Sequence, residues 1–342
     1  MYSPTSAAFQ VLKAFAAAAL LLPVGAANAE TGGKTMPSAI SFRIDFAEKT
    51  GELRHFWNST GFTPAAWILR PDMRQNCIYL GSVPHDGIRY VRIHNFLELI
   101  KITDVETDSP KYDFTDLDAA LDVLVQNGLK PGFEIMGFPK GTKEFFKDFG
   151  DDKQLWAWRK LVKETAQRYI GRYGKQEVYA WLFETWNEPD ANKWWKANLA
   201  NWPKYHDACA EGLMDADPNL KFGGPGTCGG FSEPFKVAVN HYQNGKNYFT
   251  GEPTRKPDFF SVHIKGPGAV EGCIDEMLEG GKKGEIRQIK YLREHAPRIA
   301  DVPFVNNEWD IIVGWNTNTP TGMPGPIMHR GSARAFISIL PA

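Results

Sequence analysis

Short apolar runs alternate with amphipathic segments along most of the chain. Each apolar run predicts a strand, and the predicted strands cover residues 55–62, 91–96, 131–137, 178–183, 220–223, 259–264 and 303–306. The run at 178–183 is continuously apolar, as expected for a strand that is buried on both faces of a parallel sheet.

Helices are predicted between these strands. A stripe of apolar residues at helical spacing begins near Thr115 and stops at Gly128, and a second stripe, which includes Trp158 and Tyr169, ends at Gly174. Further helices are predicted near 195–215, 232–244, 286–292 and 331–340. Alternating strands and helices indicate parallel βαβ units. Seven such units, with no G-x-G-x-x-G after the first strand, favour a (β/α)₈ TIM barrel over a doubly wound sheet.

The two ends of the sequence predict how the chain divides into domains. Residues 1–29 combine Lys13, an apolar stretch at 14–26 and the small-x-small sequence Ala27-Asn28-Ala29, which is typical of a secretory signal peptide. We therefore expect export, to a secreted or periplasmic location in a bacterium or to the lysosome in an animal. The catalytic barrel is expected to cover 30–342, and it lacks an eighth strand because the sequence ends just after the predicted helix at 331–340.

Composition removes several function classes. The 39 basic and 40 acidic residues give a net charge of −1, so nothing favours binding to nucleic acid or to an anionic membrane surface. No other stretch is long and apolar enough to insert into a membrane. The four cysteines form no C-x-x-C and the eight histidines form no H-E-x-x-H, so we expect no metal and no cofactor. Disulfide pairing and oligomeric state are left open.

Two glutamates follow strands that lie far apart in the sequence. Glu188 follows the fourth predicted strand, within an Asn-Glu-Pro triplet, and Glu308 follows the seventh. In a barrel the carboxyl ends of the strands carry the active site. Cleavage of a glycosidic bond needs one carboxyl group to protonate the leaving oxygen and a second to act at the anomeric carbon. We therefore expect Glu188 to be the acid/base and Glu308 the nucleophile.

Other polar residues at strand ends are expected to line a sugar site. Asn187 can donate to a sugar 2-hydroxyl, and Lys265 can pair with a sugar carboxylate unless it is merely solvated. His94 and His263 can donate to ring hydroxyls or be hydrogen-bonded core residues, and Asp310 follows the seventh strand. Two further carboxylates, Glu134 and Glu184, are interpreted as members of hydrogen-bond networks inside the barrel, with Glu134 the weaker catalytic candidate.

At these residues the chain resembles glycoside hydrolase family 39, and within it the α-L-iduronidase branch. The resemblance runs from about residue 42 to about residue 340 and includes F-W-N-S-T-G-F at 56–62, F-E-T-W-N-E-P-D at 183–190 and G-G-P-G at 223–226. It implies retaining double displacement with Glu188 and Glu308 in the roles above. It also implies that backbone around Gly314 and Trp315 meets a uronate carboxylate. The implied substrate is a non-reducing-end α-L-iduronoside of a glycosaminoglycan such as dermatan or heparan sulfate.

The chain departs from the family pattern at two kinds of position. Asn307 and Trp309 flank the nucleophile where relatives usually have Asp and Ala, and relatives continue beyond the seventh helix with further site residues and further domains. Two alternatives therefore stay open. One is a β-xylosidase-like family member, which would not need Lys265, and the other is an inactive sugar-binding protein.

Overall fold

The computed structural model describes residues 43, 45, 47–48, 51–52, 58–62, 64–85, 87–191, 195–264 and 274–308. The chain divides into two units, Met1–Leu53 and Arg54–Ala342. All the helices and strands described belong to the second unit. Among the described residues, none of the helices combines the length and the apolar character that a membrane span needs.

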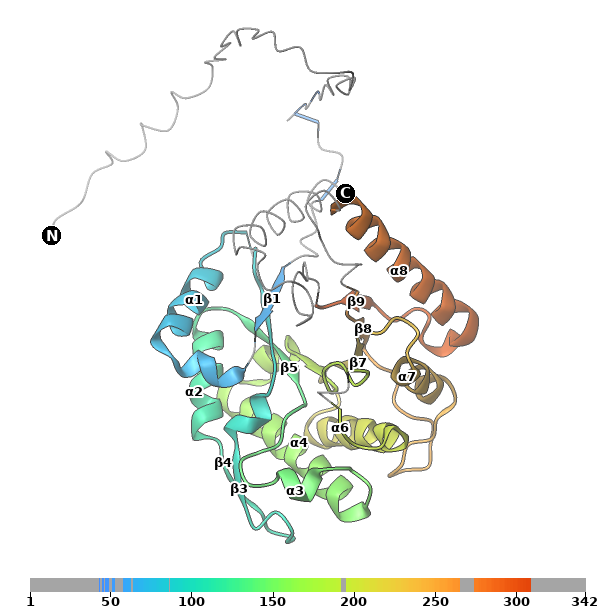
Figure 1. Ribbon diagram of the computed structural model, residues 1–342. Helices are drawn as coiled ribbons and strands as arrows, with labels where there is room; N and C mark the ends of the chain where they lie inside the picture. Colours follow the sequence, from blue (N-terminus) through green and yellow to red (C-terminus); the bar gives the residue numbers. More distant parts are fainter. Residues whose placement is uncertain are drawn as a thin grey trace, which may run out of the picture. The chain divides into compact units, whose positions relative to one another are not determined.

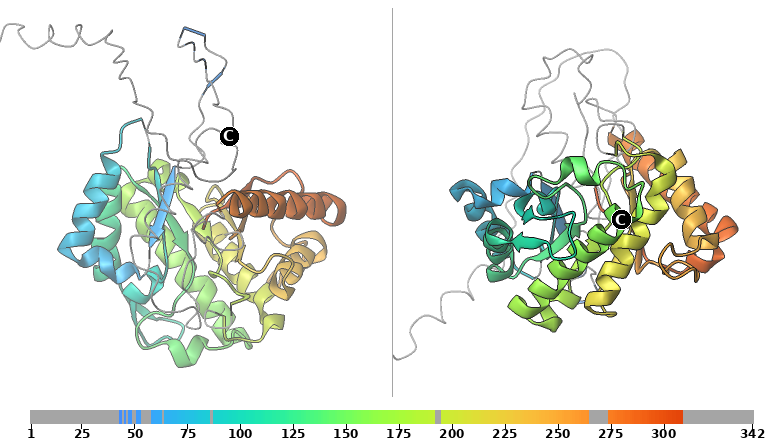
Figure 2. Two further views of the ribbon diagram at one scale, coloured as in Figure 1. Left: turned by 45° about the horizontal axis from the view of Figure 1, so that its top comes forward. Right: turned by 90° about the horizontal axis from the view of Figure 1, so that it is seen from below.

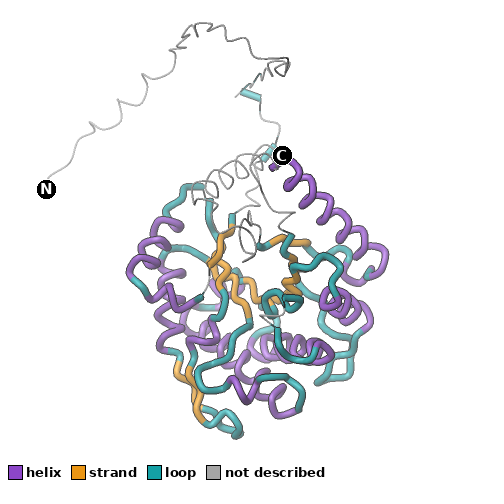
Figure 3. Tube along the Cα trace, viewed as in Figure 1, coloured by secondary structure: helices purple, strands orange, loops and turns teal. Residues whose placement is uncertain are grey.

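Seven parallel strands make the central sheet of the second unit (Figures 1 and 3). In spatial order they are β1 (Ser59–Phe62), β2 (Tyr90–Ile93), β5 (Lys130–Glu134), β6 (Leu182–Glu184), β7 (Phe222–Thr227), β8 (Phe259–Val262) and β9 (Phe304–Asn306). Spatial order follows chain order, so each crossover adds its strand next to the previous one, as in a barrel. The predicted (β/α)₈ architecture is confirmed, and seven of its strands lie among the described residues.

Helices surround this sheet on the outside, as the views in Figure 2 show. The longer ones are α1 (Pro71–Gly81), α2 (Thr115–Gln126), α4 (Asp152–Tyr173), α6 (Trp202–Ala216), α7 (Glu233–Asn244) and α8 (Ile274–His295). The side chain of Asp151 caps α4 by accepting from the backbone N–H of Gln154. The predicted stops are confirmed, because Gly128 and Gly174 take positive φ values of 74° and 84° just beyond α2 and α4.

An aromatic cluster fills the space between α4, α6 and the segment after β6. Phe149 stacks on Trp195 with ring centroids 5.6 Å apart, and Trp186 meets Trp195 edge to face at 5.5 Å. Tyr205 of α6 packs against both tryptophans and against Trp158 of α4. Buried rings of this size contribute a large share of the hydrophobic stabilisation. They also fix Trp186, which immediately precedes the Asn-Glu-Pro triplet.

Four parts of the predicted secondary structure need correction. Residues 178–179 are not in a strand: Val178 is fully buried in the short helix α5 (Lys175–Tyr179), and the strand begins at Leu182. Phe96 belongs to the 3₁₀ helix η2 (Phe96–Leu99) and not to β2. The chain also forms a β-hairpin of β3 (Lys101–Thr103) and β4 (Lys111–Asp113) that was not predicted. Helix α1 was not predicted either. The predicted signal peptide at 1–29 and the predicted helix at 331–340 lie outside the described residues.

Candidate active site

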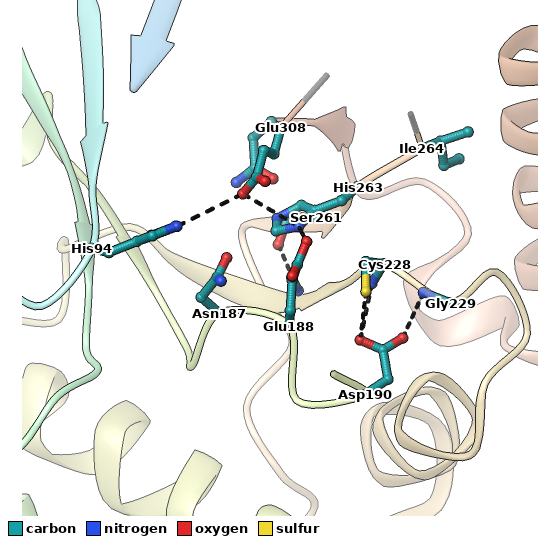
Figure 4. A network of polar contacts seen from close by, with 12 residues as sticks. His94, Asn187, Glu188, Asp190, Cys228, Gly229, Ser261, His263, Ile264 and Glu308 are labelled. Atoms are coloured by element: carbon teal, nitrogen blue, oxygen red, sulfur yellow. Dashed lines mark hydrogen bonds and ion pairs between the residues drawn. The ribbon is translucent and has the colours of Figure 1, made fainter. Parts of the chain in front are cut away.

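The carboxyl ends of four strands bring a group of polar side chains together. His94 follows β2, Asn187 and Glu188 follow β6, His263 follows β8, and Glu308 follows β9. Figure 4 shows these five side chains facing one another. The parallel register of the sheet produces this arrangement, because it places every strand's carboxyl end at the same rim. Five of the predicted site residues are therefore adjacent in the structure.

The two predicted catalytic carboxylates lie on either side of His263. Nδ1 of His263 lies 2.9 Å from Oε1 of Glu188 and 3.5 Å from Oε2 of Glu308. One oxygen of Glu188, one oxygen of Glu308 and one ring nitrogen of His263 all fall within 4.8 Å of one another. Glu188 is buried, whereas the Glu308 side chain keeps 26% of its surface exposed. A substrate can therefore reach Glu308 from solvent.

Three hydrogen bonds hold the backbone around Glu188 in an uncommon conformation. Glu188 has a φ of 43°, a left-handed value that non-glycine residues rarely adopt, and its N–H donates to the carbonyl of Gly226 at 2.9 Å. Two residues later, the Asp190 carboxylate accepts from the N–H of Gly229 at 2.6 Å and from the Ser232 hydroxyl at 2.8 Å. These bonds fasten the loop after β6 to the start of α7, so the Glu188 side chain is held toward the site.

Arg92 of β2 connects the site to the barrel interior. Its guanidinium lies 2.7 Å from Glu134, 2.7 Å from Glu184 and 3.1 Å from Glu308. It also donates to Oδ1 of Asn187 at 3.0 Å, which fixes the orientation of that amide. Glu134 and Glu184 thus sit in an interior network, as predicted. No role was predicted for Arg92 from the sequence. Residues two apart on a strand point to the same face, so the spacing of Arg92 from His94 could have indicated that both face the site.

Mutual charge compensation favours the ionised forms of Arg92 and Glu184. Burial alone would lower the pKa of Arg92, but the facing carboxylates, Glu134 first, raise it above its ordinary value. Burial likewise opposes ionisation of Glu184, but Arg92 lowers the pKa of that carboxyl below its usual range. The guanidinium therefore stays charged beside Glu308 at every physiological pH.

The remaining predicted residues divide into two groups. Nδ1 of His94 lies 2.6 Å from Oε2 of Glu134, which leaves Nε2 facing Oε2 of Glu308 at 3.9 Å. Asn307, a departure from the family pattern, donates to Glu184 at 2.8 Å and so supports the strand end that carries Glu308. The predicted substrate contacts Lys265, Asp310, Gly314 and Trp315 lie outside the described residues.

Among the residues that the structure describes, two groups of side chains have atoms of the kinds that bind metal ions. One is Glu188, His263 and Glu308, and the other is the buried set His206, Asp207 and His241. In the second group Oδ1 of Asp207 lies 3.1 Å from His206 and 2.9 Å from His241, which are ordinary hydrogen-bond lengths. Hydrogen bonding accounts for both groupings, and the expectation of no metal or cofactor stays a prediction.

Several known proteins are similar to this chain in sequence and in fold. Human α-L-iduronidase is 39% identical over 81% of this chain and 43% of its own length. A β-xylosidase of Caldicellulosiruptor saccharolyticus is 27% identical over 78% of this chain and 55% of its own. The solved structure of a bacterial orthologue of human α-L-iduronidase is 37% identical with a TM-score of 0.71, covering 77% of this chain and 42% of that one. The chain thus spans less than half the length of the iduronidases it matches.

The family model described as "Glycosyl hydrolases family 39" matches residues 40–323. That range includes both strand-end glutamates and the barrel strands described above. On this match and on the iduronidase similarity, the chain belongs to glycosyl hydrolases family 39.

Proposed function

We propose that this chain is the catalytic barrel of an exo-glycosidase that removes non-reducing-end α-L-iduronic acid from glycosaminoglycans with retention of configuration. The observation that carries this proposal is the approach of Glu188 and Glu308, whose nearest oxygens lie within 4.8 Å. Retaining glycosidases keep their two carboxyl groups about 5–5.5 Å apart, whereas inverting ones leave about 6.5–9.5 Å for a water molecule. The spacing here favours direct attack by a carboxylate.

The surroundings of the two carboxylates support distinct roles. Glu308 lies beside the permanently charged Arg92, which favours its ionised form, as a nucleophile requires. Glu188 is buried, and burial favours the protonated form that an acid requires. In the first step an oxygen of Glu308 bonds to the anomeric carbon while Glu188 protonates the leaving oxygen. In the second, Glu188 takes a proton from water, which releases the sugar from Glu308.

The iduronide specificity rests on similarity and on residues beyond the described site. Identity is higher to mammalian α-L-iduronidases, at 39–40%, than to the β-xylosidase, at 27%. We propose that Lys265, Asp310, Gly314 and Trp315 complete the sugar site, with Lys265 facing the uronate carboxylate. Lys265→Ala should then abolish hydrolysis of an iduronide and leave a neutral xyloside unaffected. Equal loss on both substrates would contradict this assignment.

The experiment that tests the reaction uses a fluorogenic α-L-iduronide from pH 3 to pH 8. Glu308→Gln should remove turnover, and Glu188→Gln should lower it about 10²–10⁴-fold, the usual contribution of general acid–base catalysis. Glu233→Gln, at the exposed start of α7, is the matched control and should retain wild-type rates. Proton NMR of the first product should show the α-anomer. Release of the β-anomer would refute the retaining mechanism, and unchanged rates in both glutamine variants would refute the site.

Export is a further part of the proposal. The sequence at 1–29 has the features of a signal peptide, and it lies outside the described residues. Expression of the full chain in a secreting bacterium should yield a mature protein that begins after Ala29. Mass spectrometry of the purified protein would show the uncleaved N-terminus if this expectation is wrong.

A further inference from the structure

We propose that His263 is a positioning residue whose single Nδ1–H donates to whichever of the two catalytic carboxylates is charged at each stage of the reaction. This inference rests on the proposed function and deepens it. The starting observation is that one ring nitrogen faces both carboxylates, at 2.9 Å from Glu188 and 3.5 Å from Glu308 (Figure 4). A residue that only contacted sugar would not need this double approach.

The surroundings of the ring determine where its hydrogen lies. The His263 side chain is fully buried, and its Nε2 has no hydrogen-bond partner among the described residues. A neutral imidazole carries one N–H and one lone pair, and a charged carboxylate can only accept. A hydrogen on Nδ1 therefore makes a charge-assisted bond, whereas a hydrogen on Nε2 would be buried without an acceptor. These contacts favour the Nδ1–H tautomer.

The backbone keeps the ring fixed while the carboxylates change charge. The N–H of His263 donates to the carbonyl of Thr227 at 2.8 Å, and β8 immediately before it is paired on both sides, with β7 and with β9. Because the ring is held by the sheet, it offers one donor at one position. The 2.9 Å contact has the length of a normal hydrogen bond, and the 3.5 Å contact is at the outer limit. A small movement of either carboxylate can shorten the contact to Glu308 and lengthen the contact to Glu188.

The charge moves between the carboxylates once in each half of the reaction. In the structure Nδ1 is nearer to Glu188 than to Glu308. Once Glu188 is protonated and Glu308 is charged, as the first step requires, the Nδ1–H favours Glu308. Glu308 then bonds to the anomeric carbon, the glycosidic C–O bond breaks, and the proton of Glu188 goes to the leaving oxygen. Glu188 is now the anion and receives the Nδ1–H. When water releases the sugar, Glu188 regains a proton and Glu308 regains its charge, so His263 itself gains and loses none.

The second half of the reaction should depend on His263 more than the first. Arg92 lies 3.1 Å from Glu308 and supports that carboxylate throughout. Four ionisable groups lie near the ring and its two partners. They are Glu184 on β6, Arg92 on β2, His94 beside Glu308, and Glu134 beside Arg92 and His94. These groups stay in place in a His263 variant, so a change in pH dependence reports the lost Nδ1 donor.

Three substitutions separate this role from a sugar contact. His263→Asn keeps an amide N–H near the position of Nδ1, His263→Gln moves it to the position of Nε2, and His263→Leu removes it. On an α-L-iduronide with an activated aryl leaving group, the Leu and Gln variants should lose about tenfold to a hundredfold in kcat, the usual effect of losing a charge-assisted bond. KM should fall with kcat, because the glycosyl-enzyme accumulates. The Asn variant should recover most of the rate.

The opposite pattern would overturn the inference. If His263 only binds the sugar, KM should rise in the Leu variant while kcat holds, and Asn should be no better than Gln. Comparing Asn with Gln decides the question even where the Leu variant does not fold, because both keep an amide.

A second measurement needs no turnover. With ¹³C-labelled glutamate in the full chain, the Glu188 carboxyl signal is identified by its loss in Glu188→Gln. Its titration midpoint should rise by about one pH unit in the Leu and Gln variants, equivalent to a tenfold change, and return toward wild type with Asn. An unchanged midpoint would refute the inference. Failure of the wild-type chain to cleave the iduronide would instead refute the proposed function, and the titration would still decide the role of His263.

Discussion

Replacing Arg92 with methionine is the strongest perturbation that the structure suggests. Methionine has a similar length and packs in an apolar space, but it removes the charge that faces Glu134 and Glu184, both at 2.7 Å. The arginine side chain is only 8% exposed, and those of its two interior partners are at most 4% exposed, so water cannot replace the lost cation. Removing one partner of a buried ion pair costs about 3–5 kcal/mol of folding free energy. We expect a loss in that range near neutral pH.

The loss should depend on pH, with a sign fixed by Glu184. In the wild type the pKa of Glu184 is lowered, so its contribution to stability is present above the unfolded value of about 4.3 and is lost as pH falls through the folded pKa. In Arg92→Met burial raises the folded pKa instead. Stability in the variant is then greatest below about pH 4.3 and is lost as pH rises through the raised value. The difference between the two proteins therefore grows from acid to neutral pH.

Urea unfolding followed by tryptophan fluorescence at pH 4.5 and pH 7.5 measures this difference. Arg70→Met is the matched control, because Arg70 pairs with Asp72 on the surface and both side chains are more than half exposed. The control should leave the unfolding midpoint unchanged. A loss below about 1 kcal/mol for Arg92→Met at pH 7.5, or an equal loss at both pH values, would refute the argument that Arg92 compensates buried carboxylates.

Three further predictions concern packing and hydrogen bonding around the site. Gly212→Ala should lower stability by about 1–3 kcal/mol in urea unfolding, because an added Cβ would lie 2.8 Å from Cβ of Val162 across the α4–α6 contact. Burial opposes the charge of Asp207, but hydrogen bonds from two histidines lower its pKa, so Asp207→Asn should cost about 1.5–3 kcal/mol at pH 6 and less at pH 3. Asp190→Ala frees two backbone donors and the Ser232 hydroxyl, and it should lower kcat on the iduronide more than Ser232→Ala does.

Much of the barrel could be predicted because local signals agree with the final fold. The two glycine stops lie just beyond α2 and α4, since a left-handed φ is easily adopted only by glycine. The secondary-structure prediction failed where the pattern of apolar residues does not indicate the type of element. Val178 is buried in the short helix α5. From the sequence alone, an apolar residue buried in a short helix looks the same as one buried in a strand. Helix α1 fully buries only Cys77, and its exposed apolar residues Ile78 and Tyr79 obscure the helical spacing of its buried face.

Strand β7 is the opposite case, a buried strand whose sequence does not favour a strand. Between Phe222 and Thr227 it contains only glycine and proline, which strands disfavour, yet all six residues are buried. Glycine is needed there because a Cβ on Gly223 would lie 2.3 Å from the carbonyl of Phe259 on β8. That requirement comes from a neighbouring strand 36 residues later, so no local pattern carries it.

The sequence by itself determined the alternation of strands and helices and placed Glu188 and Glu308 at strand ends, because periodicity and motif are properties of contiguous residues. Only the tertiary structure decided that Arg92 joins three carboxylates and that one nitrogen of His263 faces both Glu188 and Glu308. These contacts join residues 42 to 216 positions apart. Their distances depend on how the parallel strands register around the barrel, and that register is set by packing of the whole sheet.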